Sequence, residues 1–211
     1  MKSKMNVAIL IYKNVELVDM NGPLDAFLHA NSYNGGRYQV YTVASKPGPI
    51  VSEGDVVTIM PQFTIANCPV PDIVVIPGIM NDDYTPGVAD AVAIEWLKKL
   101  GKAKKIIMSV CIGSFTLAKT GLLSGKKATT HYLSVDDFHK QYPDINIVKN
   151  VRYVEDGNLV STGGITSGID GALYLVGKID GPDIAQQTAD VMVYNRDNPL
   201  PPYTILPPYY S

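Results

Sequence analysis

The chain alternates short, continuous apolar runs with longer stretches in which apolar residues recur three or four positions apart. The first pattern is typical of strands buried on both faces, and the second of amphipathic helices. Two alternating runs at 151–162 flank Asp156-Gly157, which predicts a hairpin. The other patterns predict strands at 6–12, 38–44, 54–59, 72–78, 106–110 and 128–130, and helices at 21–30, 88–100, 115–123, 135–142, 168–178 and 183–194.

Strands that alternate with helices indicate an α/β fold, in which helices cover both faces of a mostly parallel sheet. We expect residues 1–197 to form one domain. The Pro/Tyr-rich tail at 198–211 could be a disordered end or an extended arm packed on another surface. Ligand sites in such folds lie beyond the carboxyl ends of the strands. Asp19, Pro77-Gly78-Ile79 and Cys111 each follow a predicted strand, so we expect them to converge there.

The composition narrows the partners and the compartment. The 211 residues carry a net charge of −2 and no basic tract, which argues against a nucleic-acid partner. The apolar run at 7–12 is too short for a secretory signal or a membrane span. With two cysteines and no export signal, we expect a cytoplasmic protein with reduced thiols. The sequence has neither CxxC nor HExxH, so a metal site is possible but unsupported.

Cys111 is the main candidate for chemistry. It stands between a predicted strand and a predicted helix, with Ser109 and Gly113 two positions away on either side. That spacing resembles the G-x-S-x-G nucleophile elbow, with cysteine as the nucleophile. We expect the helix N-terminus to favour the thiolate and to lower the thiol pKa. The alternative is that Cys111 is a small buried apolar residue, as free cysteines commonly are.

Backbone groups near the cysteine could stabilise negative charge. The N–H of Ile112 follows the nucleophile, as the donor of a nucleophile elbow does, and Gly113 permits the tight turn. Gly78 allows close backbone geometry, so the N–H of Ile79 could be a second donor. Alternatively, Pro77-Gly78 merely ends a strand.

Asp19 is the candidate proton donor. Considered alone, it suits a helix cap or a turn. If it faces Cys111, burial and like-charge repulsion would hold its carboxyl in the protonated form, and it could act as a general acid. Asp25 is a rival, although the charge at a helix N-terminus also explains an acid at that position.

Histidine offers a different mechanism. His131 lies 20 residues after the cysteine and could be the base of a Cys–His dyad, or simply a core or surface residue. No histidine follows His139, which disfavours a triad completed late in the chain. The sequence therefore favours thiol chemistry assisted by a carboxyl group.

Taken together, these segments resemble the DJ-1/PfpI superfamily, and within it the isocyanide (isonitrile) hydratase branch. The resemblance extends over most of the chain up to about residue 175. The segments that carry it are VDMNGPLDAF at 18–27, CPVPDIVVIPG at 68–78, SVCIGS at 109–114, GLLSGKKATTH at 121–131 and DGNLVSTGGITSGID at 156–170.

The resemblance implies a flavodoxin-like three-layer sandwich, a homodimer, and an active site without metal or cofactor. It implies that Cys111 is the nucleophile and Asp19 the acid/base partner in the hydration of an isocyanide to an N-formamide. Two positions depart from the hydratase pattern. Ile112 replaces a threonine after the nucleophile, and Ile79 replaces the second glycine of a P-G-G loop. Ile112 makes the surroundings of the thiol more apolar, and Ile79 adds bulk that could narrow the pocket, so the substrate range could differ.

Other functions within the superfamily remain alternatives. Similar domains sense small molecules when they are fused to AraC-type DNA-binding regions, and other branches have glyoxalase-type or peptidase activity. Those enzymes commonly carry a glutamate near the cysteine or, in the peptidase-like branch, a histidine directly after it. The presence of Asp19 and Ile112 favours the hydratase over both.

Overall fold

The protein is described from a computed structural model, which covers residues 3–81 and 85–196. Seven strands form the central sheet in the order β10-β11-β7-β6-β1-β2-β5, and every neighbouring pair is parallel except β10 and β11. Their bounds are β1 (Met5–Leu10), β2 (Tyr38–Ala44), β5 (Phe63–Thr64), β6 (Ile73–Ile76), β7 (Ile106–Val110), β10 (Tyr153–Asp156) and β11 (Leu159–Thr162).

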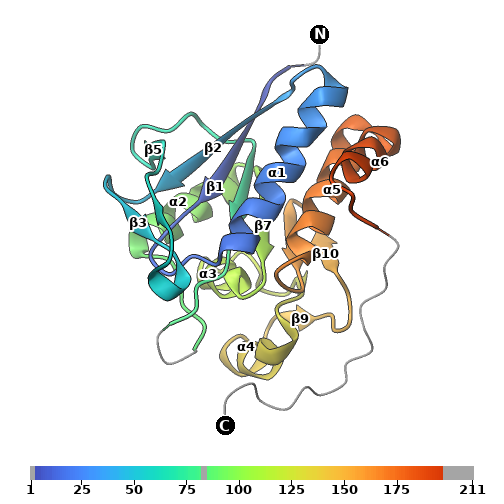
Figure 1. Cartoon of the computed structure of the whole chain (residues 1–211). Coiled ribbons are helices and arrows are strands. Elements are labelled where there is room, and N and C mark those ends of the chain that lie inside the picture. Colours follow the sequence, from blue (N-terminus) through green and yellow to red (C-terminus); the bar gives the residue numbers. More distant parts are fainter. Residues whose placement is uncertain (1–2, 82–84, 197–211) are drawn as a thin grey trace.

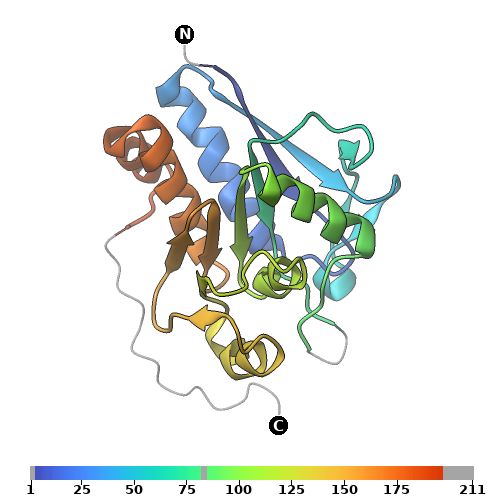
Figure 2. The same ribbon diagram turned by 180° about the vertical axis from the view of Figure 1, so that it is seen from behind.

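Helices cover both faces of this sheet, which gives three layers. One face carries α1 (Leu17–Asn34), α5 (Ser167–Asp180) and α6 (Pro182–Val191), which pack against one another. The other carries α2 (Ala91–Lys102) and α3 (Gly113–Lys119). Figure 1 views the molecule from the α1 side, and Figure 2 shows α2 and α3 in front. The flavodoxin-like α/β fold expected from the sequence is confirmed.

Smaller elements surround the carboxyl ends of the strands. β3 (Ile50–Val51) and β4 (Thr58–Ile59) form an antiparallel hairpin around the short 3-10 helix η1 (Glu53–Asp55). A hydrogen bond from the Glu53 N–H to the Val15 carbonyl, 3.1 Å long, ties this hairpin to the segment before α1. β8 (Lys127–Ala128) and β9 (Asn146–Ile147) pair in parallel near η2 (Tyr132–Ser134) and α4 (Val135–Gln141).

Most predicted elements are present, with shifted ends. The strand at 38–44 matches β2, and the hairpin at Asp156-Gly157 is the β10–β11 turn. The first helix begins four residues earlier than the predicted start at residue 21. It starts at Leu17, so Pro23 lies inside α1 and not in its first turn. The predicted tail at 198–211 lies outside the described residues.

The apolar strand residues account for the core. Val7 to Leu10 and Ile73 to Ile76 are fully buried because helices cover both faces of these central strands. Across the described ranges, no helix is long and apolar enough to span a membrane.

Candidate functional site

Cys111 occupies the turn between β7 and α3. Its φ of +57° is unusual for a residue with a side chain and marks the sharp turn of a nucleophile elbow. Gly113 makes the turn possible, because an added Cβ would overlap the Ile76 carbonyl oxygen and lie 2.6 Å from that of Pro77. The thiol residue is only 7% exposed, so the site is nearly closed to solvent.

Asp19 lies at the same edge of the sheet. The N–H of Gly78, at the end of β6, donates a 2.8 Å hydrogen bond to Asp19 Oδ2. A Cβ on Gly78 would lie 2.8 Å from both Asp19 Oδ2 and Ile112 Cγ1, so only glycine fits between them. The structure therefore brings together the carboxyl group, the glycine loop and the residue after the cysteine, as the sequence predicted.

The Asp19 carboxyl is fully buried. No N–H or hydroxyl group in the described parts of the chain donates to Oδ1. Burial raises the pKa of Asp19 well above its usual value, and the negative charge of Glu16 raises it further, against the opposing effect of the Gly78 N–H. This increase in the Asp19 pKa is in the direction predicted from the sequence. The Asp19 carboxyl therefore retains its proton at pH values where an exposed aspartate is ionised.

The prediction of a low thiol pKa is wrong. Burial raises the pKa of Cys111 well above its usual value, and the charge of Asp19 raises it further. Backbone N–H groups of Ile165 and Ile112 lower it, but they do not outweigh the loss of solvation. α3 has only seven residues and its N-terminus cannot compensate for burial at this depth.

Ile165 is a donor that the sequence reasoning missed. Its N–H faces the thiol from the loop between β11 and α5. The backbone there is tight: Ile165 has a φ of +31°, and an added Cβ on Gly164 would lie 2.5 Å from His131 Cδ2. The Gly163-Gly164 pair is the only sequence signal that could have indicated this turn.

Glu16 and Glu53 were also missed. Glu16 caps α1, because its carboxylate accepts a hydrogen bond from the Asp19 N–H. Its carboxyl also interacts with those of Asp19 and Glu53. Burial, followed by the charge of Glu16, raises the pKa of Glu53 to about 6.

The remaining candidates have other surroundings. Asp25 is exposed in the third turn of α1, so its predicted place in the first helical turn is wrong. His131 is half-buried beside Tyr132, burial lowers its pKa, and it makes no hydrogen bond to the thiol within the described structure. Ile79 is buried, and its carbonyl accepts a 2.8 Å hydrogen bond from the Gly87 N–H. A role of the Ile79 N–H as an oxyanion donor stays a prediction.

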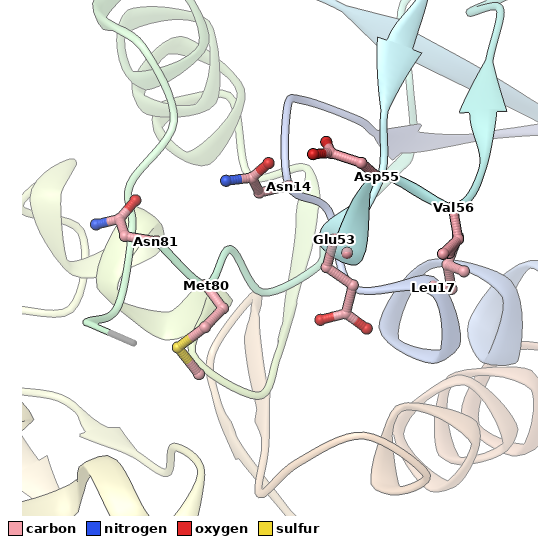
Figure 3. A pocket seen from close by; sticks show the side chains of 8 residues that line it. Asn14, Leu17, Glu53, Asp55, Val56, Met80 and Asn81 are labelled. Atoms are coloured by element: carbon pink, nitrogen blue, oxygen red, sulfur yellow. The ribbon is translucent and has the colours of Figure 1, made fainter. Parts of the chain in front are cut away.

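A pocket of about 540 Å³ opens beside the N-terminus of α1 (Figure 3). Its wall includes Leu17, two positions before Asp19, and Glu53 from η1. The thiol itself does not line it. Among the described residues, no group of three or more His, Cys, Asp or Glu side chains is placed to hold a metal ion. The full lining is Asn14, Leu17, Glu53, Gly54, Asp55, Val56, Met80 and Asn81.

Comparison with known proteins identifies the family. A sequence model of the DJ-1/PfpI family matches residues 5–178. The chain belongs to the DJ-1/PfpI family. The crystal structure of a ThiJ/PfpI family protein from Pseudomonas syringae superposes with a TM-score of 0.78 at 27% identity. The match covers 94% of this chain and 78% of that one.

Two relatives of this chain have names that describe different functions. The isonitrile hydratase of Pseudomonas putida is 31% identical over 200 residues, which cover 94% of this chain and 81% of the hydratase. The HTH-type transcriptional regulator CdhR of Pseudomonas aeruginosa is 32% identical over 106 residues, which cover 50% of this chain and 31% of the regulator. The relatives of this chain therefore include both an enzyme and a transcriptional regulator.

Proposed function

We propose that the protein is a cofactor-independent isocyanide hydratase that uses Cys111 as nucleophile and Asp19 as acid/base. The observation that carries this proposal is the Asp19 carboxyl, buried at the thiol's edge of the sheet with Oδ2 fixed by Gly78 and Oδ1 unpartnered within the described structure. Similarity to an isonitrile hydratase over nearly the whole chain supports the same chemistry.

In the reactive form of the site, the Asp19 carboxyl and the Cys111 thiol carry one proton in total. With the proton on Asp19, the repulsion that adds to the effect of burial on the thiol pKa disappears, and the N–H groups of Ile112 and Ile165 stabilise the thiolate. The thiolate sulfur then forms a bond to the terminal isocyanide carbon of R–N≡C. Asp19 delivers its proton to the same carbon, which gives the thioimidate R–N=CH–S–Cys111.

Water completes the turnover. The Asp19 carboxylate accepts one proton from the attacking water, whose oxygen adds to the thioimidate carbon, and the second proton of the same water passes to the nitrogen. The carbon–sulfur bond breaks, the thiolate leaves, and R–NH–CHO is released with Asp19 protonated again. The sum is addition of one water molecule, without any redox change.

Purified protein should convert cyclohexyl isocyanide to its formamide, measured by mass spectrometry or NMR. Cys111→Ala should abolish turnover, and Asp19→Asn should reduce it by roughly 100-fold or more because the proton donor is lost. Cys68→Ala is the matched control, since Cys68 is the other free cysteine. Saturable turnover by Cys111→Ala would contradict the proposal.

A sensory role is the second candidate, because the regulator CdhR matches half of the chain. It predicts that small molecules raise the melting temperature without being converted. Methylglyoxal and a peptide substrate, assayed alongside the isocyanide, test the glyoxalase-type and peptidase alternatives. The homodimer implied by the family resemblance stays a prediction, which sedimentation velocity measures directly.

A further inference from the structure

A second pocket opens next to the one beside α1. Its volume is about 640 Å³, which is within the range of small-molecule sites. Asn14 and Asn81, labelled in Figure 3, line both pockets, so the two are direct neighbours. Neither Cys111 nor Asp19 lines the second pocket. The chemistry proposed above therefore does not account for it.

The second pocket lies where the strand order of the sheet reverses. β1 leads through α1 to β2 in one direction, whereas its neighbour β6 leads through α2 to β7 in the other. The pocket is lined by residues 11–13, which follow β1, by residues 44–46 at the end of β2, and by Ile79 after β6. Open α/β sheets bind ligands in the crevice at such a point, beyond the carboxyl ends of the strands. The position of the pocket is therefore that of a ligand site.

Two lysines give the pocket its positive charge. Leu10 and Val43 lie opposite one another in the parallel pairing of β1 with β2. Lys13 and Lys46 each follow three positions later, so they leave neighbouring strands at equivalent positions, and both line the pocket. Neither forms an ion pair in the part of the chain that the structure describes. Their like charges repel each other, and an anion bound between them would replace this repulsion by attraction.

The acidic residue of the lining, Asp90, has other partners. Its Oδ1 caps α2 by accepting a 3.0 Å hydrogen bond from the Ala93 N–H, and it accepts a 2.8 Å hydrogen bond from the Ser45 hydroxyl. These bonds fix the end of β2 to the start of α2 at the pocket wall. Because the carboxylate faces a helix N-terminus, its charge is compensated in part. The two lysines therefore leave the lining with a net positive charge.

Apolar side chains form much of the remaining wall. Pro47, Pro49 and Ile50 come from the segment after β2, and Val88, which is 44% exposed, comes from the segment before α2. The proline rings fix the backbone φ angles, so less conformational entropy is lost here when a ligand binds. An apolar wall beside two lysines suits a ligand that has one charged end and an apolar body.

We propose that the second pocket binds a small organic anion, with its carboxylate or phosphate group between Lys13 and Lys46 and its apolar body against the proline wall. The site does not rest on the proposed hydratase function, because neither lysine takes part in the reaction at Cys111. Its test is therefore a binding measurement that requires no turnover.

Titration of isotope-labelled protein with hexanoate and with hexyl phosphate, followed by NMR, tests binding and locates it. The two probes share an apolar body, so a comparison of their affinities identifies the preferred head group. We expect saturable shifts of the Asn14 and Ser45 amide signals, since both residues line the pocket. The uncharged probe 1-hexanol should bind roughly tenfold more weakly, because it cannot pair with the lysines.

Removal of each positive charge tests the head-group contact. Lys13→Gln and Lys46→Gln should each weaken binding of the charged probes by roughly fivefold, as expected for an exposed ion pair, without affecting 1-hexanol. Lys99→Gln is the matched control. It makes the same charge change at an exposed lysine of α2 that does not line the pocket, and it should leave the affinity unaltered.

An added negative charge tests the location independently. Val88→Asp places a carboxylate in the pocket and should abolish binding of both anions, whereas Val92→Asp, at a 51% exposed position of α2 outside the lining, should preserve it. Binding should also persist in Cys111→Ala. The proposal is overturned if neither charged probe binds saturably, or if the two lysine variants and Val88→Asp leave binding unchanged. Shifts confined to the surroundings of Cys111 would place the anion in the candidate active site and would overturn it as well.

Discussion

Opposing influences act on the Cys111 thiol. Burial and the nearby Asp19 carboxyl raise its pKa, while the N–H groups of Ile112 and Ile165 lower it. A cysteine at a strand–helix turn is expected to be activated by the helix, but in the proposed reaction the thiol becomes reactive through the protonation state of its neighbour. In that reaction Asp19 has two effects: it supplies a proton, and by holding that proton it removes a negative charge from beside the sulfur.

Asp19→Asn should lower the pKa of the Cys111 thiol even though it stops hydration. Asparagine can still accept the Gly78 N–H, and it is neutral at every pH, so the repulsion on the thiolate is lost. Thiolate absorbance or iodoacetamide reactivity as a function of pH measures the change. Asp25→Asn, exposed on the same helix, is the control and should have no effect. An unchanged or higher thiol pKa in Asp19→Asn would contradict this account of the site.

At the scale of elements, the contact between α3 and the end of β6 holds the site together. Gly113, the first residue of α3, packs against the Ile76 and Pro77 carbonyl groups. The next residue of that strand end, Gly78, holds Asp19 through its N–H. A change in this contact therefore moves Cys111 relative to Asp19.

Gly113→Ala should destabilise the fold by about 1–3 kcal/mol or more, because the added methyl group overlaps backbone atoms that cannot rotate away. Urea unfolding measures the loss, and activity should fall with it. Gly177→Ala in α5 is the matched control. Its added Cβ meets only Ala185 Cβ at 3.4 Å, so we expect a neutral or slightly stabilising effect. Equal stability of the two variants would exclude the tight contact as the cause.

The elements and the first site residues could be predicted because they depend on local patterns. Buried strands and amphipathic helices produce the periodicities that revealed most of the sheet, and strand ends placed Asp19, Gly78 and Cys111 on one edge. The start of α1 was missed because its cap is Glu16, a residue type that seldom caps helices. Two-residue strands such as β3 and β8 are too short to show a period.

The rest of the site depends on contacts that the sequence does not display. Glu53 lies 37 positions after Glu16 and reaches it only because the β3–β4 hairpin folds back onto the segment before α1. Ile165 meets the thiol because β11 is the neighbour of β7, so the loop after one strand approaches the loop after the other. The direction of the thiol pKa was predicted wrongly for a similar reason, since burial depends on the whole fold.

At the scale of the whole molecule, four carboxyl groups fall into two classes with opposite shifts in pKa. At the surface, Asp72 and Glu155 pair with Lys105 and Lys178, and hydrogen bonds from these lysines help to lower their pKa values. At the carboxyl end of the central strands, burial raises the pKa of Asp19 and Glu53 instead. The first class stabilises the folded state most when it is ionised, and the second when it is protonated.

This division predicts how stability depends on pH. Folded protein holds the Glu53 proton up to about pH 6, whereas an unfolded glutamate loses it at about pH 4.3. The stabilisation from this proton is complete below the unfolded pKa and is lost as pH rises through the folded pKa. Glu53→Gln has no such loss. Relative to the natural protein, it should gain about 1 kcal/mol between about pH 4 and 8, after allowance for the screening of a half-exposed group.

Thermal unfolding of the natural protein and Glu53→Gln over that range measures the difference. A gain of about 1 kcal/mol corresponds to a melting temperature higher by about 2–4 °C for a domain of this size. Comparing the two proteins cancels the contributions that the other titrating groups make to the pH dependence of stability. One of these groups is His131, whose lowered pKa makes stability rise with pH, opposite to the effect of Glu53. The melting temperature of Asp55→Asn should differ from that of the natural protein by an amount that does not vary with pH. If Glu53→Gln does the same, the Glu53 carboxyl is not held protonated by the fold, and the contact with Glu16 does not couple the two groups.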